Sequence, residues 1–132
     1  MKANELRIGN LVYPNDDNGT PYPVTEIREN TICCTNKGDE EYNWCMPEVV
    51  IGLGDIQPIE LTEEWLFRFG FKKRKVAGFW FDYRLEYVVI DCMDGSEFDI
   101  YFSSLHQTKL EYVHQLQNLY FALTGEELEI KP

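Results

Sequence analysis

Turn-forming residues recur so closely in the first sixty positions that only short strands fit between them. The longest turn-rich stretch, residues 14–21, reads Pro-Asn-Asp-Asp-Asn-Gly-Thr-Pro, and a tighter turn is centred on Gly38. The segments between the turns carry β-branched, aromatic or cysteine residues. Five strands are therefore expected, at residues 6–13, 22–28, 31–35, 41–46 and 56–61.

A long first loop, two tight hairpins and an irregular connection over residues 47–55 are typical of a small SH3-like barrel. We therefore assign a five-strand SH3-like β-barrel to residues 1–61. The segment lacks the aromatic-rich loop motif of signalling SH3 domains, so binding of proline-rich peptides does not follow from this fold.

Residues 62–132 predict a second unit, in which an antiparallel β-meander lies between two helices, so the fold class is α+β. Thr62 can cap a helix over residues 63–69, and Gly70 is suited to ending it. Asp94-Gly95 between two apolar runs predicts a two-residue hairpin turn. With that register, one face of the sheet carries Leu85, Tyr87, Val89, Phe98, Ile100 and Phe102.

The clearest helix pattern covers residues 107–124 and ends at Gly125, ahead of a short acidic tail. Its polar face is expected to carry Glu111, His114, Gln115 and Asn118. Leu116 is expected to be fully buried. The whole apolar stripe comprises Tyr112, Val113, Leu116, Leu119, Tyr120 and Leu123.

The net charge of −11 disfavours nucleic acid and anionic membranes as partners, because both carry negative charge. The cysteines lack the spacing of a zinc site and are expected to be reduced, and we expect neither a metal nor a cofactor. The N-terminus has no apolar leader, and no apolar run reaches the length of a membrane span, which favours the cytoplasm. The four cysteines are Cys33, Cys34, Cys45 and Cys92.

Motifs for nucleotide binding, serine hydrolysis and zinc-dependent hydrolysis are absent from the sequence, which favours a protein that is not an enzyme. One alternative is a small enzyme that uses Asp91 together with Asp94 or Asp99. These acids and Glu97 could also hold a hard cation such as calcium, or could be solvated side chains around the turn.

One basic cluster stands out from the acidic background, and two aromatic residues, Trp80 and Tyr83, follow it. Basic side chains beside aromatic ones can bind single-stranded nucleic acid through phosphate contacts and base stacking. Alternatively, the cluster protects a sheet edge, because lysine discourages pairing with another strand. The cluster consists of Lys72, Lys73, Arg74 and Lys75.

Phe121 lies off the apolar stripe of the last helix, where its neighbours are His114, Gln117 and Asn118. An aromatic residue with polar neighbours is a composition that protein interfaces favour, so these four residues are candidates for contact with a partner protein. The alternative is a second packing layer against the N-terminal barrel.

Three segments of the chain resemble a family of short uncharacterised proteins from phages, prophages and mobile elements of gut anaerobes. They are MKANELRIGN at residues 1–10, PIELTEEWL and FGF within residues 58–71, and YVHQLQNLYFALTGEEL at residues 112–128. The family has no assigned activity, so the resemblance implies a genomic setting and no catalytic residue. We therefore expect a non-enzymatic accessory protein that binds a host or phage protein, and the sequence leaves open whether it forms homo-oligomers.

Overall fold

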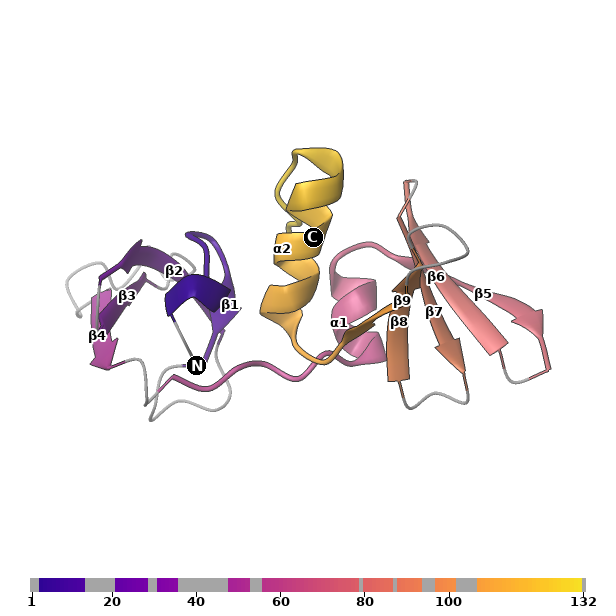
Figure 1. The fold of residues 1–132 in the computed structure, drawn as a ribbon, viewed down its shortest axis with the longest axis horizontal. Helices are drawn as coiled ribbons and strands as arrows, with labels where there is room; N and C mark the ends of the chain where they lie inside the picture. Colours follow the sequence, from indigo (N-terminus) through magenta and orange to yellow (C-terminus); the bar gives the residue numbers. More distant parts are fainter. Residues whose placement is uncertain are drawn as a thin grey trace. The chain divides into compact units, whose positions relative to one another are not determined.

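The computed structural model describes residues 3–13, 21–28, 31–35, 48–52, 56–78, 80–86, 88–93, 97–101 and 107–131. The chain divides into two compact units, Met1–Ile59 and Glu60–Pro132, and Figure 1 labels the elements of each. Neither helix in the described part of the chain is long and apolar enough to cross a membrane.

The first unit is built on a four-stranded antiparallel sheet in which the strands pair in sequence order (Figure 1). A short 3-10 helix, η1 (Ala3–Glu5), precedes the sheet. The strands are β1 (Leu11–Val12), β2 (Tyr22–Ile27), β3 (Thr31–Thr35) and β4 (Glu48–Gly52). The apolar core of this unit comprises Leu6, Val12, Val24, Ile32, Cys34 and Ile56.

The SH3-like barrel predicted for this unit is wrong, and the first reason is the position of β4. We predicted an irregular connection at residues 47–55, but Glu48–Gly52 pairs with all five residues of β3. This segment contains Val49-Val50-Ile51, a β-branched run that suits a paired strand. The strand predicted at residues 41–46 lies outside the described residues.

The second reason is that the predicted fifth strand, residues 56–61, makes only isolated bridges, from Gln57 to Tyr13 and from Glu60 to Tyr112. Pro58 lies between the two bridges and has no N–H to donate to a ladder. As a result, the described strands of the first unit form an open sheet and not a closed barrel.

The second unit contains a five-stranded antiparallel meander that follows one helix and precedes the other in sequence, and both helices lie on the same side of the meander in Figure 1. Helix α1 (Glu63–Arg68) begins where the backbone N–H of Trp65 donates to the Thr62 hydroxyl at 3.5 Å, and it ends before Gly70, whose φ of +96° suits glycine. The strands are β5 (Lys72–Ala77), β6 (Trp80–Leu85), β7 (Val88–Met93), β8 (Glu97–Tyr101) and β9 (Gln107–Leu110).

The register between β7 and β8 differs from the predicted one. Met93 pairs with Glu97, so three residues separate the strands where we predicted two. A shift of one residue moves every side chain of a strand to the other face. Val88, Ile90 and Cys92 are therefore the buried residues of β7, while Val89 is only half-buried.

The apolar face predicted for the sheet is therefore only partly confirmed. Phe98 is buried as expected, and it pairs with Cys92. Leu85 ends β6 and is half-buried. Tyr87, Phe102 and the Asp94-Gly95 turn lie outside the described residues.

Helix α2 (Val113–Thr124) is shorter than predicted, because residues 107–110 form strand β9. The end at Gly125 is confirmed: its φ is +73°, and its N–H donates to the Phe121 carbonyl at 2.8 Å. Full burial of Leu116 is also confirmed. The buried residues of the helix are Val113, His114, Leu116, Gln117 and Tyr120.

Backbone hydrogen bonds join the beginning and the end of the second unit. The N–H of Leu61 donates to the Glu111 carbonyl at 2.9 Å, and the N–H of Lys131 donates to the Arg68 carbonyl at 2.7 Å. Leu128, close to the C-terminus, is buried. Both terminal segments of this unit are therefore part of its packed structure.

Candidate functional site

Strand β5 forms one edge of the five-stranded sheet, where β6 is its partner. Every residue from Lys72 to Gly78 is exposed, including all four members of the basic cluster. An edge strand directs alternate N–H and C=O groups away from its sheet, where a further strand can pair with them. No other described strand pairs with this edge, and its side chains are largely basic in a chain whose net charge is −11.

The alternation of side chains along β5 separates its basic residues onto two faces. Lys72 pairs with Arg84, and Arg74 pairs with Asp82, so these four residues share one face of the sheet, which we call the outer face. Lys73 and Lys75 belong to the opposite, inner face. The continuous cluster expected from the sequence is therefore two groups in space.

Asp82 is the centre of the outer-face group. Its side chain is only 3% exposed, and its Oδ2 atom accepts hydrogen bonds from Arg74 Nη2 at 2.9 Å and from Arg84 Nη2 at 3.4 Å. Its Oδ1 atom is also buried and has no hydrogen-bond partner among the described residues. A buried carboxylate requires such charged partners, so Asp82 and the two guanidinium groups form a single structural group.

Sequence reasoning missed Asp82 and Arg84. A signal was present, because Asp82 is a charged residue within the aromatic run Phe79-Trp80-Phe81-Asp82-Tyr83, and Arg84 follows at the spacing that places both on one face of a strand. A charged side chain among apolar neighbours is stable in a folded protein when a side chain of opposite charge lies close to it, so Asp82 predicts a cationic partner.

Trp80 and Asp91 border this group on the outer face. The indole Nε1–H of Trp80 donates to Asp91 Oδ1 at 3.3 Å, and Asp91 pairs with Asp82 across β6 and β7. In the next strand Asp99 pairs with Asp91, so two of the acids predicted as candidates are neighbours in the sheet. The third, Asp94, lies outside the described residues.

On the inner face, Lys73 belongs to a second polar group that connects the sheet to α1. Its Nζ atom lies 2.6 Å from Glu63 Oε1, and the Tyr83 hydroxyl donates to the same oxygen at 2.9 Å. The Lys73 ammonium also lies 4.3 Å from the centre of the Phe81 ring. Lys73 is therefore occupied by contacts that hold the helix against the sheet.

These contacts shift the pKa values of Glu63 and Tyr83 in opposite directions. Hydrogen bonds from Lys73 and Tyr83 lower the pKa of Glu63. Burial is the main reason that the pKa of the Tyr83 hydroxyl is raised, and the hydrogen bond to Glu63 raises it further. Glu63 is therefore ionised and Tyr83 protonated over a wider pH range than either group would be alone.

The candidate contact residues of α2 do not form one exposed surface. His114 and Gln117 are buried, Asn118 is half-buried, and Phe121 is 38% exposed. The expectation of a solvated His114 is wrong, because the buried side of the helix is rotated to include it, and its ring stacks on Tyr112 at 5.8 Å between ring centres. Only Phe121 remains as an exposed aromatic on this helix.

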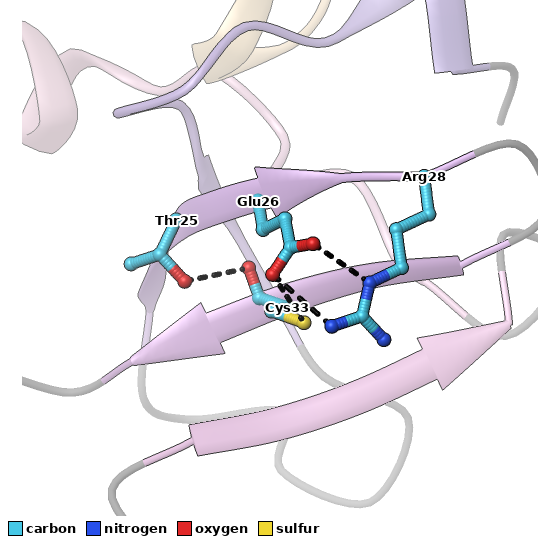
Figure 2. Close-up of polar contacts among 4 residues, drawn as sticks. All are labelled: Thr25, Glu26, Arg28 and Cys33. Atoms are coloured by element: carbon cyan, nitrogen blue, oxygen red, sulfur yellow. Dashed lines mark hydrogen bonds and ion pairs between the residues drawn. The ribbon is translucent and has the colours of Figure 1, made fainter.

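In the first unit, Cys33 is in contact with a charged pair (Figure 2). Its Sγ lies 3.7 Å from Glu26 Oε2, and the same carboxylate accepts from Arg28 Nε at 2.8 Å, an interaction that lowers the pKa of Glu26. The Thr25 hydroxyl donates to the Cys33 carbonyl at 3.1 Å. Cys33 is only 1% exposed, and burial raises the pKa of the neighbouring Cys34 to about 11, so neither thiol is placed to act as a nucleophile.

Within the described residues, no group of three or more histidine, cysteine, aspartate or glutamate side chains is arranged to hold a metal ion. No family model, curated protein or solved structure matches this chain.

Proposed function

We propose that this protein is a non-enzymatic binding protein that adds an extended acidic segment of a partner protein to the edge strand β5. The observation that supports this proposal is that all six residues of the edge strand β5 are exposed and four of them are basic, in an otherwise acidic chain. Addition of a strand to an open edge derives affinity from main-chain hydrogen bonds, and the flanking side chains select the sequence.

Charge gives the edge its selectivity. Lys72 and Lys75 form no ion pair with any residue that the structure describes, so both are available to a partner. A second copy of β5 would place lysine and arginine against lysine and arginine, which repel. An acidic strand avoids this repulsion, so the residues that prevent self-pairing also favour the proposed partner.

The resemblance to proteins of mobile elements suggests that the partner is a host or phage protein. The proposed contact lies on β5 and not on the α2 residues that the sequence predicts, because two of those, His114 and Gln117, are buried. Asp91 lies beside the outer-face group, and its negative charge would repel the phosphates of a nucleic-acid backbone that ran along this face. We therefore favour a protein partner over nucleic acid.

The test is fluorescence anisotropy at low ionic strength with a labelled peptide of alternating glutamate and valine. We expect binding by the full chain, and we expect Lys75→Glu to weaken it about three- to tenfold. Lys131→Glu is the matched control, because Lys131 is exposed and lies outside β5.

A second peptide carries N-methyl groups on alternate residues, so it keeps its charges but cannot complete a ladder of hydrogen bonds. Equal binding of both peptides would contradict strand addition. Tighter binding of an oligodeoxythymidylate than of the acidic peptide, at the same salt concentration, would instead identify a nucleic-acid surface.

A further inference from the structure

The outer face contains two arginine side chains that converge on one atom. Arg74 Nη2 and Arg84 Nη2 both contact Oδ2 of the buried Asp82, at 2.9 Å and 3.4 Å, while the arginine side chains themselves are 57% and 48% exposed. Each guanidinium has five N–H donors, and Asp82 uses only part of this capacity. Two cations are thus held close together with donors left for a second anion.

We infer that Arg74 and Arg84 form an oxyanion site that binds a phosphorylated side chain in the segment that pairs with β5. This inference rests on the proposed function, and it adds the chemical class of the residue recognised. Arginine is suited to this role because its planar group can donate two parallel hydrogen bonds to a phosphate.

The local charge favours a phosphate over a carboxylate. Lys72 pairs with Arg84 and lies on the same face, so on β5 and β6 the outer face carries three cations and the single charge of Asp82. Asp91 on β7 offsets one further positive charge, and the cations that remain in excess are matched better by a phosphoserine, which carries close to two negative charges at neutral pH, than by a glutamate.

The buried carboxylate also orders the site before any ligand arrives. Because Asp82 is fixed within β6 and only 3% exposed, it restricts the two flexible arginine side chains that contact it. Ordering the donors in advance lowers the entropy lost on binding. Asp91, held by Trp80 on the neighbouring strand, limits the cationic area to β5 and β6, which suits a single phosphate group.

The test compares three labelled peptides that are identical except for a central serine, glutamate or phosphoserine. We expect the full chain to bind the phosphoserine peptide about tenfold more tightly than the glutamate peptide. Arg84→Gln should remove that preference, and Arg84→Lys should reduce it, because lysine keeps the charge but lacks the planar donor pair. Lys75→Gln, on the inner face of β5, should weaken binding of all three peptides alike.

The outcomes separate the two proposals. Equal affinity for the three peptides would overturn the phosphate site and leave strand addition intact, whereas failure to bind any of them would overturn both. Orthophosphate distinguishes a peptide-borne phosphate from the free ion. An excess should abolish the phosphoserine advantage without changing affinity for the serine peptide, and persistence of the advantage would count against the arginine site.

Discussion

Asp82 is the one acidic residue of β6, where it lies between two aromatic residues, and its two arginine partners explain how the strand accommodates it. The carboxylate is almost entirely buried, while Arg74 and Arg84 remain about half exposed. Water therefore hydrates the two cations but not the carboxylate. The hydrogen bonds from the arginines offset much of the hydration free energy that the Asp82 carboxylate loses on burial.

Replacement of Asp82 tests this description. Asp82→Asn keeps the size of the side chain but removes its charge, so we expect a loss of about 1–3 kcal/mol in the free energy of unfolding. Urea denaturation followed by circular dichroism provides the measurement. Glu64→Gln, an exposed acid-to-amide change on α1, is the control and should alter stability by less than about 0.5 kcal/mol.

Tyr83→Phe removes one hydrogen bond to Glu63, so we expect it to reduce stability by about 1 kcal/mol at neutral pH. The pKa of Glu63 is lower in the folded than in the unfolded protein, so its contribution to stability is present above the unfolded value and is lost as pH falls through the folded value. Tyr83→Phe should bring the two values closer and make this acid-dependent loss smaller. Thermal unfolding across the acidic range measures it, and an unchanged pH profile would mean that the hydrogen bond does not persist in solution.

At the scale of the elements, the packing of α2 can be tested at one fully buried residue and one exposed residue. Leu116 is completely buried, so Leu116→Ala should lower the free energy of unfolding by about 2–5 kcal/mol through lost transfer energy and a residual cavity. Phe121→Ala, on the exposed side of the same helix, should cost less than about 1 kcal/mol. Chemical denaturation of both variants decides the point, since similar costs would mean that the helix is packed in a different orientation.

Local signals predicted where α1 begins and where α2 ends, but not where α2 begins. Thr62 and Gly125 mark helix ends because capping depends on a few adjacent residues. The register of β7 and β8 was not predictable in the same way, since it depends on whether the turn after Met93 has two or three residues. That single residue decides which side of each strand is buried.

The candidate site was predictable only in part, for a related reason. The four basic residues are adjacent in sequence, and their composition alone identified them. Their division between two faces, and the contact of Arg74 with Asp82 eight positions later, depend on the pairing of β5 with β6. Such cross-strand neighbours follow from the hairpin and not from the spacing of residues along one strand.

At the scale of the whole molecule, the proposed binding surface lies entirely in the second unit. Residues 60–132 contain both helices, the five-stranded sheet and every residue of the outer-face group. We expect a fragment of these residues to unfold cooperatively and to bind the acidic peptide at least as tightly as the full chain, because the first unit is also acidic. Calorimetry and anisotropy on the fragment test this expectation, and loss of binding by a folded fragment would place part of the surface elsewhere.

The hydrogen bonds that join the two ends of the second unit have a consequence for how it folds. Each strand of the meander pairs with its neighbour in sequence, so these pairs close short loops and form rapidly. The bond from Leu61 to Glu111 closes a much longer loop, and so does the bond from Lys131 to Arg68. We therefore expect the sheet to assemble hairpin by hairpin and the terminal segments to join it last, which makes their release the first step by which the unit opens.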